Sequence, residues 1–565
     1  MTETERPEAE RTGTGTAERE ETGTEPSEMT PPGGTGRLRA LIRGRGSRRG
    51  AGVVLAVAVL VVGLAWALAS PVGGSPDDDF HLGSIWCPRP IDSSGCRTRV
   101  EDGEVRVQVP QRVGASRDCY FFHPEISAGC QLSLSDDKQV YSRRYDDGGY
   151  PTGYYRFHHM FVGDNVARSA IVMRGVNLLI AVALLGGIGL VLPPWMRERY
   201  ALAIILSWMP MGIYFVASNN PSSWALTGVL GYAAGMYGSV RVAGRRRWVL
   251  LGLSLVGAVL ACSCRGDAAF YLFVVSLAVF AGIRWRRRIL VQAATALVVS
   301  VIGVWTMLGT GQARSGVSTE FFSDLPDHTR LMVIIFTLPE YFAGFYGRRW
   351  GAGWFDVPFD GPVTIIALVL AGAAVFAGVR RLGWRKIVSA GALLGIPVVL
   401  SYGQGLENVY RLQPRYLLPL LVPFFIVWLD QRRRSAVLSA PQTALVVVLS
   451  AIAHGYALHR ILLRYTHGLH NYGEMDAGWL PFNLDFKLEW WWRIPISPMT
   501  LWIVATAMYA VALTSALLLV RPRSDRGAGA AASDDCGTTG SDHPRTRPAA
   551  TGESRLHEPR PQSET

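Results

Sequence analysis

The sequence predicts an all-α integral membrane protein with about 12 transmembrane helices. Three observations support this fold class. Of the 565 residues, 49% are hydrophobic, and the apolar residues are gathered into runs close to the ~20 residues that cross a bilayer core. The 56 Lys and Arg residues lie mainly in short clusters between these runs, which is typical of an orientation signal. Basic residues placed in this way do not form a nucleic-acid-binding surface, so no nucleic acid partner is expected.

The first apolar run, residues 51–70, sets the predicted orientation. It follows a segment with six Arg residues between positions 37 and 49, which should remain cytoplasmic. Its length is typical of a signal anchor rather than of a cleaved leader. Further Arg-rich loops that should face the cytoplasm lie at 197–199, 241–247, 284–288, 380–386 and 432–434. The crossings that satisfy this orientation, with both termini inside, are 51–70, 176–193, 200–217, 223–240, 248–263, 269–283, 289–308, 362–379, 387–403, 416–429, 443–459 and 499–520.

The apolar segment 331–346 is expected to lie at the outer membrane face as an interfacial or re-entrant helix. Counting it as a crossing would place the basic loop at 380–386 outside. It also contains Pro339 and Glu340, and a stretch rich in Trp and Phe follows it. Such a segment is less costly at an interface than in the hydrocarbon, where backbone and carboxyl groups find no water.

The remaining segments divide into tails and outer loops. Residues 1–36, with nine Glu and three Arg, and residues 521–565 show no apolar periodicity, so we expect disordered cytoplasmic tails. Between them, residues 37–520 form the polytopic membrane domain. Its cytoplasmic loops are short and contain no Gly-Lys-Ser/Thr phosphate-binding loop. A functional site is therefore expected in the outer stretches, which are 71–170, 309–361, 404–415 and 460–498.

Four of the seven cysteines lie in the outer stretch 71–170, which indicates an oxidising compartment. Three disulfide pairings are possible. Proximity along the chain favours Cys87 with Cys96 and Cys119 with Cys130. Zinc binding is the alternative, but no Cys-x-x-Cys spacing supports it.

Three adjacent carboxylates, Asp77, Asp78 and Asp79, follow the first crossing closely. Mutual repulsion and partial desolvation should raise the pKa of at least one of them unless a cation compensates. The cluster suits a general base or a hard divalent metal such as Mg or Mn, held by Asp77 and Asp78. A solvated acidic turn after a helix is the alternative interpretation.

Two arginines are expected at the outer ends of crossings. Arg265, near Asp267, could pair with a lipid phosphate or with that aspartate. Arg415 stands at the head of an apolar helix, and its planar guanidinium can bind phosphate oxygens bidentately. As an isolated residue it could equally be an anchor whose charge reaches the membrane surface.

Several motifs, taken in order, resemble a known bacterial multipass membrane family, catalogued as domain of unknown function 2142. They are Pro76-Asp77-Asp78-Asp79-Phe80-His81, Tyr150-Pro151 with Tyr154-Tyr155, Asn220-Pro221, Gly353-Trp354-Phe355-Asp356 and Arg415-Tyr416-Leu417-Leu418-Pro419. The resemblance spans roughly residues 50–520, and His81-Leu82-Gly83-Ser84-Ile85-Trp86-Cys87 is similar to the actinobacterial branch.

The layout of that family is similar to the C-type superfamily of membrane glycosyltransferases, which use polyprenyl-phosphate sugar donors. This analogy is at the level of the fold. It implies that Asp77 or Asp78 deprotonates an acceptor hydroxyl or holds a metal, while Arg415 and Arg265 stabilise the departing lipid phosphate. By the same resemblance, His81, Asp356 and Tyr416 are candidate substrate-binding residues.

The function expected from these features is sugar transfer at the outer face of a bacterial plasma membrane. The donor would be a polyprenyl-phosphate sugar, and the acceptor an envelope glycan or lipid. The alternative is a membrane protein without catalytic activity that serves envelope assembly or transport, with the acidic loop as a docking or ion-binding surface. Few carboxylates lie within the predicted crossings, which gives little support to ion transport.

Overall fold

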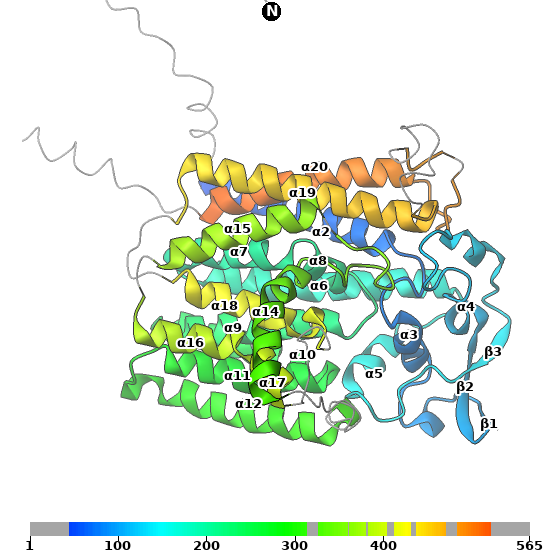
Figure 1. Cartoon of the computed structure of the whole chain (residues 1–565), viewed down its shortest axis with the longest axis horizontal. Helices are drawn as coiled ribbons and strands as arrows, with labels where there is room; N and C mark the ends of the chain where they lie inside the picture. The colour runs from blue at the N-terminus through cyan, green and yellow to red at the C-terminus, as the bar shows by residue number, and fades with distance from the viewer. Residues whose placement is uncertain are drawn as a thin grey trace, which may run out of the picture.

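The computed structural model describes residues 45–312, 326–359, 361–379, 382–403, 412–430, 437–469, 483–486 and 488–520. The tails predicted at 1–36 and 521–565 lie outside the described residues, as do parts of the three later outer stretches. Within the described ranges the chain is mostly helical, and its long helices run side by side in one bundle (Figure 1). The predicted class of fold is therefore confirmed as helical.

The apolar runs of the sequence form the bundle helices. Their bounds are α2 Arg45–Leu68, α6 Val166–Val191, α7 Pro194–Trp208, α8 Met211–Val216, α9 Ser222–Ser239, α10 Arg245–Cys264, α11 Gly266–Ala281, α12 Leu290–Gly309, α15 Pro362–Val379, α16 Trp384–Leu394, α17 Ile396–Gly403, α18 Pro414–Trp428, α19 Ala440–Thr466 and α20 Pro498–Val520. Each of the twelve predicted crossings coincides with one or two of these helices.

Seven helices of the described ranges are long and apolar enough to cross a membrane: α2, α6, α10, α12, α15, α19 and α20. The remaining five predicted crossings are shorter, broken or less apolar. Two of them are the short apolar helices α11 and α18. Another is divided into α7 and α8 before Pro210, which lacks the backbone N–H needed to continue a helix. These helices still pack within the bundle. Length and composition therefore identify fewer candidate crossings than the distribution of charged residues predicts.

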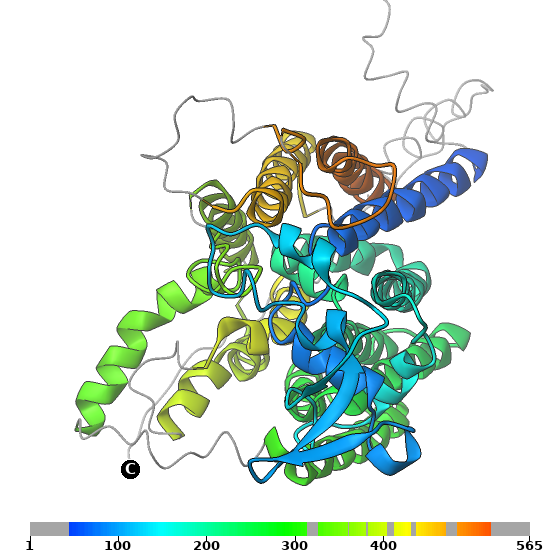
Figure 2. The same cartoon turned by 90° about the vertical axis from the view of Figure 1, so that its right-hand side faces the viewer.

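Helix α14, Asp327–Gly344, contains the segment predicted to be interfacial. It runs across the direction of the bundle in both views (Figures 1 and 2). It carries Arg330, Pro339 and Glu340, and it is not among the seven candidate spans. Both findings agree with a segment that does not cross the membrane alongside the other helices.

A seam of small residues holds α9 and α10 together. A Cβ atom added to Gly257 would lie 2.5 Å from the backbone nitrogen of Tyr232 and 2.6 Å from the backbone oxygen of Gly228. The two backbones therefore approach each other at a distance that only glycine permits, as in other helix pairs within membranes.

Replacing Gly257 with Leu should force α9 and α10 apart and lower the free energy of unfolding by at least ~1–3 kcal/mol, the usual cost of overpacking. The melting temperature of the detergent-purified protein would measure this loss. Gly252→Leu is the matched control, because Gly252 is an exposed glycine of the same helix with no atom within 4 Å of an added Cβ. Equal melting temperatures for the two variants would contradict the seam.

The stretch between α2 and α6 forms a small polar lobe at one end of the bundle, to the right in Figure 1. Its elements are α3 Asp78–Trp86, η1 Ile91–Ser93, β1 Thr98–Glu101, β2 Glu104–Pro110, α4 Gln111–Gly114, η2 Ala128–Ser133, β3 Gln139–Ser142 and α5 Gly153–His159. The strands form an antiparallel sheet in the order β1-β2-β3, with Val107 opposite Thr98 and Val109 opposite Val140. Val107 and Val109 are buried, so the alternation of β2 turns its apolar side towards the lobe interior.

Candidate functional site

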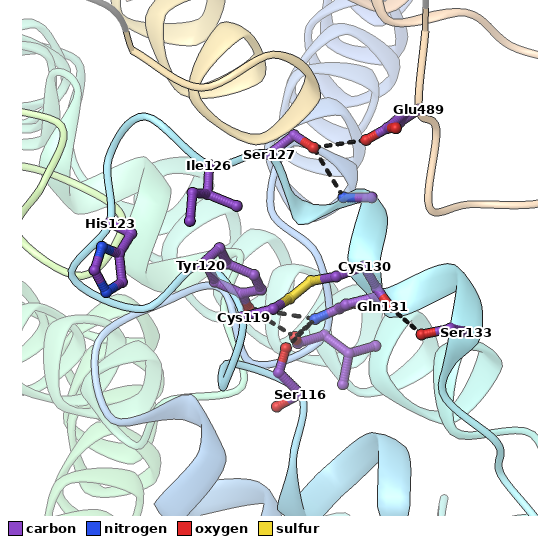
Figure 3. Close-up of a disulfide and its surroundings, with 12 residues drawn as sticks. Ser116, Cys119, Tyr120, His123, Ile126, Ser127, Cys130, Gln131, Ser133 and Glu489 are labelled. Carbon is purple, nitrogen blue, oxygen red and sulfur yellow. Dashed lines mark hydrogen bonds between the residues drawn. A yellow bond between two sulfur atoms is a disulfide. The ribbon is translucent and has the colours of Figure 1, made fainter.

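The lobe contains two disulfides, and the second lies beside a residue that holds the segment leading to the acidic cluster. Cys87 pairs with Cys96 and Cys119 pairs with Cys130, which is the pairing that proximity favoured. The second disulfide lies beside Gln131 (Figure 3). The side-chain amide of Gln131 donates to the backbone oxygens of Val72 and Ser116, at 2.5 and 2.7 Å. Gln131, the residue after this disulfide, therefore holds the chain at Val72, five residues before Asp77.

Asp77 is the residue before α3 and has a left-handed backbone, with φ 60°. Asp78 and Asp79 begin the helix, where the helix dipole favours carboxylates. Successive residues of an α-helix are rotated by roughly 100°, so adjacent carboxylates face different directions. Among the described residues, Asp78 is accordingly paired with Arg174 alone, whereas Asp77 and Asp79 share Arg144 and each have one further arginine.

Asp77 faces the end of α18. A terminal nitrogen of Arg415 lies 3.1 Å from its carboxylate, and Arg144 lies 3.5 Å from it. Burial opposes ionisation of Asp77, but the charges of Arg415 and Arg144 hold its pKa below the ordinary value. Its side chain remains 39% exposed, so an ionised carboxylate is accessible at this point.

Asp79 lies on another side of α3 and is nearly fully buried. It accepts two hydrogen bonds from Arg144, at 2.9 and 3.2 Å, and it also forms an ion pair with Arg117 at 3.0 Å. Arg144 therefore bridges Asp77 and Asp79. This bridge fixes the direction of the first turn of α3.

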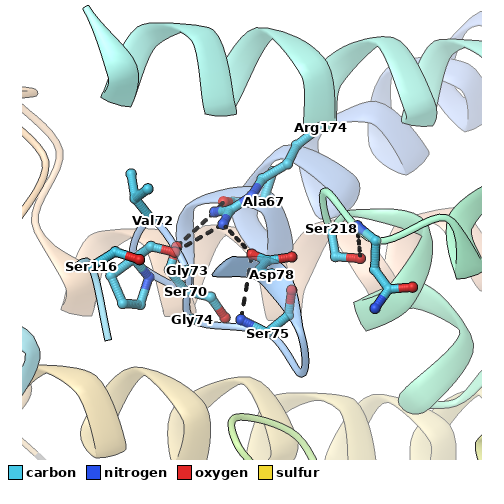
Figure 4. Close-up of polar contacts among 12 residues, drawn as sticks. Ala67, Ser70, Val72, Gly73, Gly74, Ser75, Asp78, Ser116, Arg174 and Ser218 are labelled. Atoms are coloured by element: carbon cyan, nitrogen blue, oxygen red, sulfur yellow. Dashed lines mark hydrogen bonds and ion pairs between the residues drawn. The ribbon is translucent and has the colours of Figure 1, made fainter. Parts of the chain in front are cut away.

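Asp78 points towards Arg174 of α6 (Figure 4). It lies 3.3 Å from the guanidinium of Arg174, which also donates to the backbone oxygens of Ala67, Ser70 and Pro71 at 2.7–2.8 Å. Both side chains are almost completely buried. Burial raises the pKa of Asp78. Asp78 and Arg174 thus connect α3 and α6 with the C-terminal end of α2.

Arg265 and Arg415 meet at one aromatic ring. The guanidinium carbon of Arg265 lies 5.0 Å from the ring centre of Tyr416, and that of Arg415 lies 4.9 Å from it. Arg265 also forms a two-point ion pair with Asp267, at 2.9 and 2.8 Å, so this alternative from the sequence is confirmed. Tyr416 accepts a hydrogen bond of 3.1 Å from Arg415. The structure brings together two arginines that are 150 positions apart in the sequence.

His81 lies one helical turn after Asp77, and its backbone N–H donates to the oxygen of Asp77 at 2.9 Å. Its Nδ1 lies 3.0 Å from the hydroxyl of Tyr155. Burial lowers the pKa of His81 to about 3, although the nearby charge of Asp77 opposes the shift. His81 is therefore a neutral imidazole at physiological pH.

Asp356 does not join this cluster. Its carboxylate pairs with Arg464 at 2.7 Å, and Arg464 donates in addition to the backbone oxygens of Tyr120, His123 and Ile126. Arg464 therefore connects α19 with the loop of residues 119–130, which the disulfide Cys119–Cys130 closes. The preceding residue, Phe355, lies under Arg415 instead, with 4.7 Å between the guanidinium carbon and the ring centre. Among the described residues, the Gly-Trp-Phe-Asp motif therefore contacts Arg415 through the ring of Phe355, and its carboxylate does not reach Arg415.

The donor set around Asp77 does not fit a divalent cation. In the described ranges, no group of three or more His, Cys, Asp or Glu side chains is close enough together to hold a metal ion. Asp77 is paired with Arg415, whereas Asp78 is paired with Arg174. The two carboxylates therefore do not converge on one point. Two carboxylates already paired with arginines are poor ligands for Mg or Mn, because the metal would have to displace those cations.

Several residues of the cluster were not predicted from the sequence as site residues. Arg144 and Arg174 lie in segments without a recognisable motif, and only their partners reveal a role. Tyr150 and Tyr155 belong to a motif that the sequence gives only as part of the family resemblance, without a role. In the structure, the ring of Tyr150 lies 5.7 Å from the guanidinium carbon of Arg265. The sequence offered one indication of this contact, which is that Arg265 was expected at the outer end of a crossing.

Comparison with known proteins identifies the family of the chain but assigns no reaction to it. No curated protein and no solved structure is significantly similar to it. A family described as Predicted membrane protein (DUF2142) matches residues 60–424, which include the acidic cluster, both arginines of the site and most of the bundle. The match covers more than half of the chain, and the chain therefore belongs to this family of multipass membrane proteins.

Proposed function

We propose that the protein is a membrane glycosyltransferase of the outer face, which transfers a sugar from a polyprenyl-phosphate donor to an envelope acceptor. One observation carries the proposal: Asp77, an accessible ionised carboxylate, lies against Arg415, whose ring neighbour Tyr416 also contacts Arg265. A base beside two cations suits a reaction in which a proton leaves one reactant and negative charge develops on the other.

The charge balance of the cluster favours an anionic substrate. Four guanidinium groups, of Arg117, Arg144, Arg265 and Arg415, face the three carboxylates of Asp77, Asp79 and Asp267. The excess is one positive charge in a largely buried site. Among the described residues, the buried Nε atom of Arg415 has no hydrogen-bond partner, so it is available to an incoming oxygen. A phosphate group meets both requirements.

The proposed reaction proceeds by displacement at the sugar. The acceptor hydroxyl loses its proton to Asp77, and its oxygen forms a bond to the anomeric carbon. The bond between that carbon and the phosphate oxygen breaks, and the electron pair leaves with the polyprenyl phosphate. Arg415 and Arg265 stabilise the charge that develops on the phosphate, which is the larger part of the expected acceleration.

The proposed location requires the cluster to face outwards. Both termini would be cytoplasmic, with twelve crossings of the plasma membrane, and the polar lobe of residues 71–165 would be outside. The two disulfides support this side, since an oxidising compartment maintains them. The transverse direction of α14 supports twelve crossings rather than thirteen, because a crossing by α14 would move the later Arg-rich loops to the outer side.

Single cysteines at positions 327 and 348 test this topology. Asp327 is the first residue of α14 and Arg348 lies after its end, and their side chains are 74% and 53% exposed. In a variant without Cys262, Cys264 and Cys536, both positions should react with a membrane-impermeant maleimide applied to intact cells. Arg286→Cys, in a predicted cytoplasmic loop, should react only after permeabilisation. Labelling of 327 and 348 from opposite sides would make α14 a crossing and contradict the proposed arrangement.

Purified protein incubated with labelled polyprenyl-phosphate sugars separates the enzyme from the alternative. Transfer or hydrolysis of the labelled sugar is expected. Persistent inertness across donors, in protein that is folded and correctly inserted, would favour the non-catalytic envelope-assembly or transport protein. No described contact specifically favours that second function.

A further inference from the structure

The loop of residues 353–356 has a backbone conformation that its sequence does not favour. The residues before and after it, Ala352 and Val357, close the loop with two backbone hydrogen bonds, at 3.1 and 3.3 Å. Within the loop, Gly353 and Phe355 have left-handed backbones, with φ 64° and 65°. Glycine adopts this conformation readily, whereas a bulky residue does so only under strain. Such strain persists where the surrounding structure imposes it, and it is concentrated at functional sites.

The residues on either side of Phe355 are anchored to other parts of the chain. The indole N–H of Trp354 donates to the backbone oxygen of Gly73 at 3.0 Å, and Trp354 is buried. The carboxylate of Asp356 accepts a hydrogen bond of 3.0 Å from the backbone N–H of Trp354 and pairs with Arg464 at 2.7 Å. These contacts, together with the closing hydrogen bonds, impose the left-handed conformation on the residue between the two anchors.

The strained backbone places the ring of Phe355 against Arg415. The ring centre lies 4.7 Å from the guanidinium carbon, within the distance at which an aromatic ring attracts a cation. The ring also meets Trp350 edge to face, with 5.2 Å between the two ring centres. Phe355 is only half-buried, so the filling of a core position does not account for the strain. The strained conformation thus maintains a contact with a cation of the site.

A second strained residue contacts the same arginine. Among the described residues, five that are not glycine have a positive φ. Two of them, Asp77 with φ 60° and Phe355, contact Arg415 directly. Another, Asp102, lies in the turn between β1 and β2, where a left-handed backbone is ordinary. Two segments far apart in the sequence therefore hold strained residues against one guanidinium.

An aromatic ring restrains Arg415 without using its hydrogen-bond donors. A carboxylate in place of the ring would neutralise the guanidinium and occupy its N–H groups. The neighbouring carboxylate, that of Asp356, is instead paired with Arg464. In the described part of the chain, the buried Nε atom of Arg415 has no hydrogen-bond partner. The ring therefore restrains a cation whose Nε–H stays available to an anionic ligand.

We infer that Phe355 is a positioning residue, whose ring holds the guanidinium of Arg415 in the orientation that receives the phosphate of the lipid substrate. This inference rests on the proposed function. It assigns Phe355 no contact with the reacting atoms, since its effect passes through Arg415. It also explains why phenylalanine occupies a position where glycine or asparagine would be less strained.

Phe355→Asn separates the effect of the ring from that of the backbone. Asparagine tolerates a left-handed backbone better than phenylalanine, so the variant should fold, with a melting temperature close to that of the native chain. Without the ring, the full-length protein should bind a short-chain prenyl phosphate about tenfold more weakly. Phe355→Tyr retains the ring and should bind as tightly as the native chain. Native affinity in Phe355→Asn would overturn the inference.

Phe122→Asn is the matched control. Phe122 is also a phenylalanine with a left-handed backbone, with φ 57°, and among the described residues its ring contacts Phe121 and Trp354, not an arginine. Its replacement removes the same kind of strain and should leave the affinity for prenyl phosphate unchanged. Equal weakening in Phe122→Asn and Phe355→Asn would show that the effect does not pass through Arg415 and would contradict the inference.

Phe355→Leu provides a second comparison, in which the backbone remains strained. Leucine keeps apolar volume but has no aromatic face, so this variant should bind prenyl phosphate more weakly than Phe355→Tyr, at a similar melting temperature. If Phe355→Asn does not fold, this comparison decides. Equal affinities of Phe355→Leu and Phe355→Tyr would then show that the ring does not position Arg415.

The outcomes for this inference and for the proposed function are separate. If no donor sugar is transferred but loss of the ring weakens the binding of prenyl phosphate, the enzyme proposal fails and the positioning role of Phe355 stands. If sugar is transferred but Phe355→Asn and Phe355→Leu bind prenyl phosphate as tightly as the native chain, the role of Phe355 is wrong and the enzyme proposal stands. A native chain that does not bind prenyl phosphate would contradict both.

Discussion

Asp77→Asn should lower the rate of sugar transfer by about 10²–10⁴-fold, the scale expected when a general base is removed. The amide keeps the shape of the side chain but cannot accept the proton of the acceptor hydroxyl. Because Asp77 is 39% exposed and lies outside the bundle core, folding and membrane insertion should be unaffected. Initial rates with a labelled polyprenyl-phosphate sugar, at equal amounts of inserted protein, measure the effect.

Asp102→Asn is the matched control, because Asp102 is an exposed aspartate of the same lobe, at 92% of its side chain, in the turn between β1 and β2. It should retain the native rate. The pH profile gives a further check on the base. The pKa of Asp77 lies below its ordinary value and that of His81 is about 3, so neither group should lower the rate between about pH 5 and 7. A native rate in Asp77→Asn would remove the principal support for the enzyme.

Asp78→Asn should act on stability rather than on chemistry. Removing one partner of a buried ion pair leaves the other charge uncompensated, at a typical cost of 3–5 kcal/mol. Arg174 keeps its three backbone acceptors, so a loss of about 3 kcal/mol is expected, measured as a lower melting temperature and reduced expression. Transfer by the folded fraction should persist, in contrast to Asp77→Asn.

The double variant Asp78→Leu with Arg174→Met distinguishes a lost pair from a lost carboxylate. Replacing both charges by apolar groups of similar size is often neutral, so the double variant should be more stable than either single one. Additive destabilisation of the two single changes would show that Asp78 and Arg174 act independently.

The helices could be predicted from the sequence because their apolar runs are long and the arginines between them are few and clustered. The division of one predicted crossing into α7 and α8 could not be placed in the same way, since a proline can also be accommodated inside a membrane helix. The interfacial or re-entrant placement of residues 331–346 was predicted from charge parity, supported by Pro339, Glu340 and the stretch rich in Trp and Phe that follows. Hydropathy could not have given it, because the segment is apolar.

The site was predictable as a set of residue types but not as a set of contacts. Asp77, Asp78 and Asp79 are equivalent in a sequence, and only the rotation of α3 directs Asp78 to Arg174 while Asp77 and Asp79 share Arg144. The pairing of Asp77 with Arg415 spans 338 positions, and no local pattern encodes it. Asp356 was expected near the substrate because its motif was recognisable, yet the structure directs that carboxylate to Arg464.

A cryo-electron microscopy map of the full-length protein with a bound short-chain prenyl phosphate would test the central claim most directly. The account predicts phosphate density in hydrogen-bond contact with the guanidinium groups of Arg265 and Arg415, on the same side of Tyr416 as the carboxylate of Asp77. Prenyl phosphate density away from this cluster, with Arg415 still paired to Asp77 at saturating ligand, would contradict it.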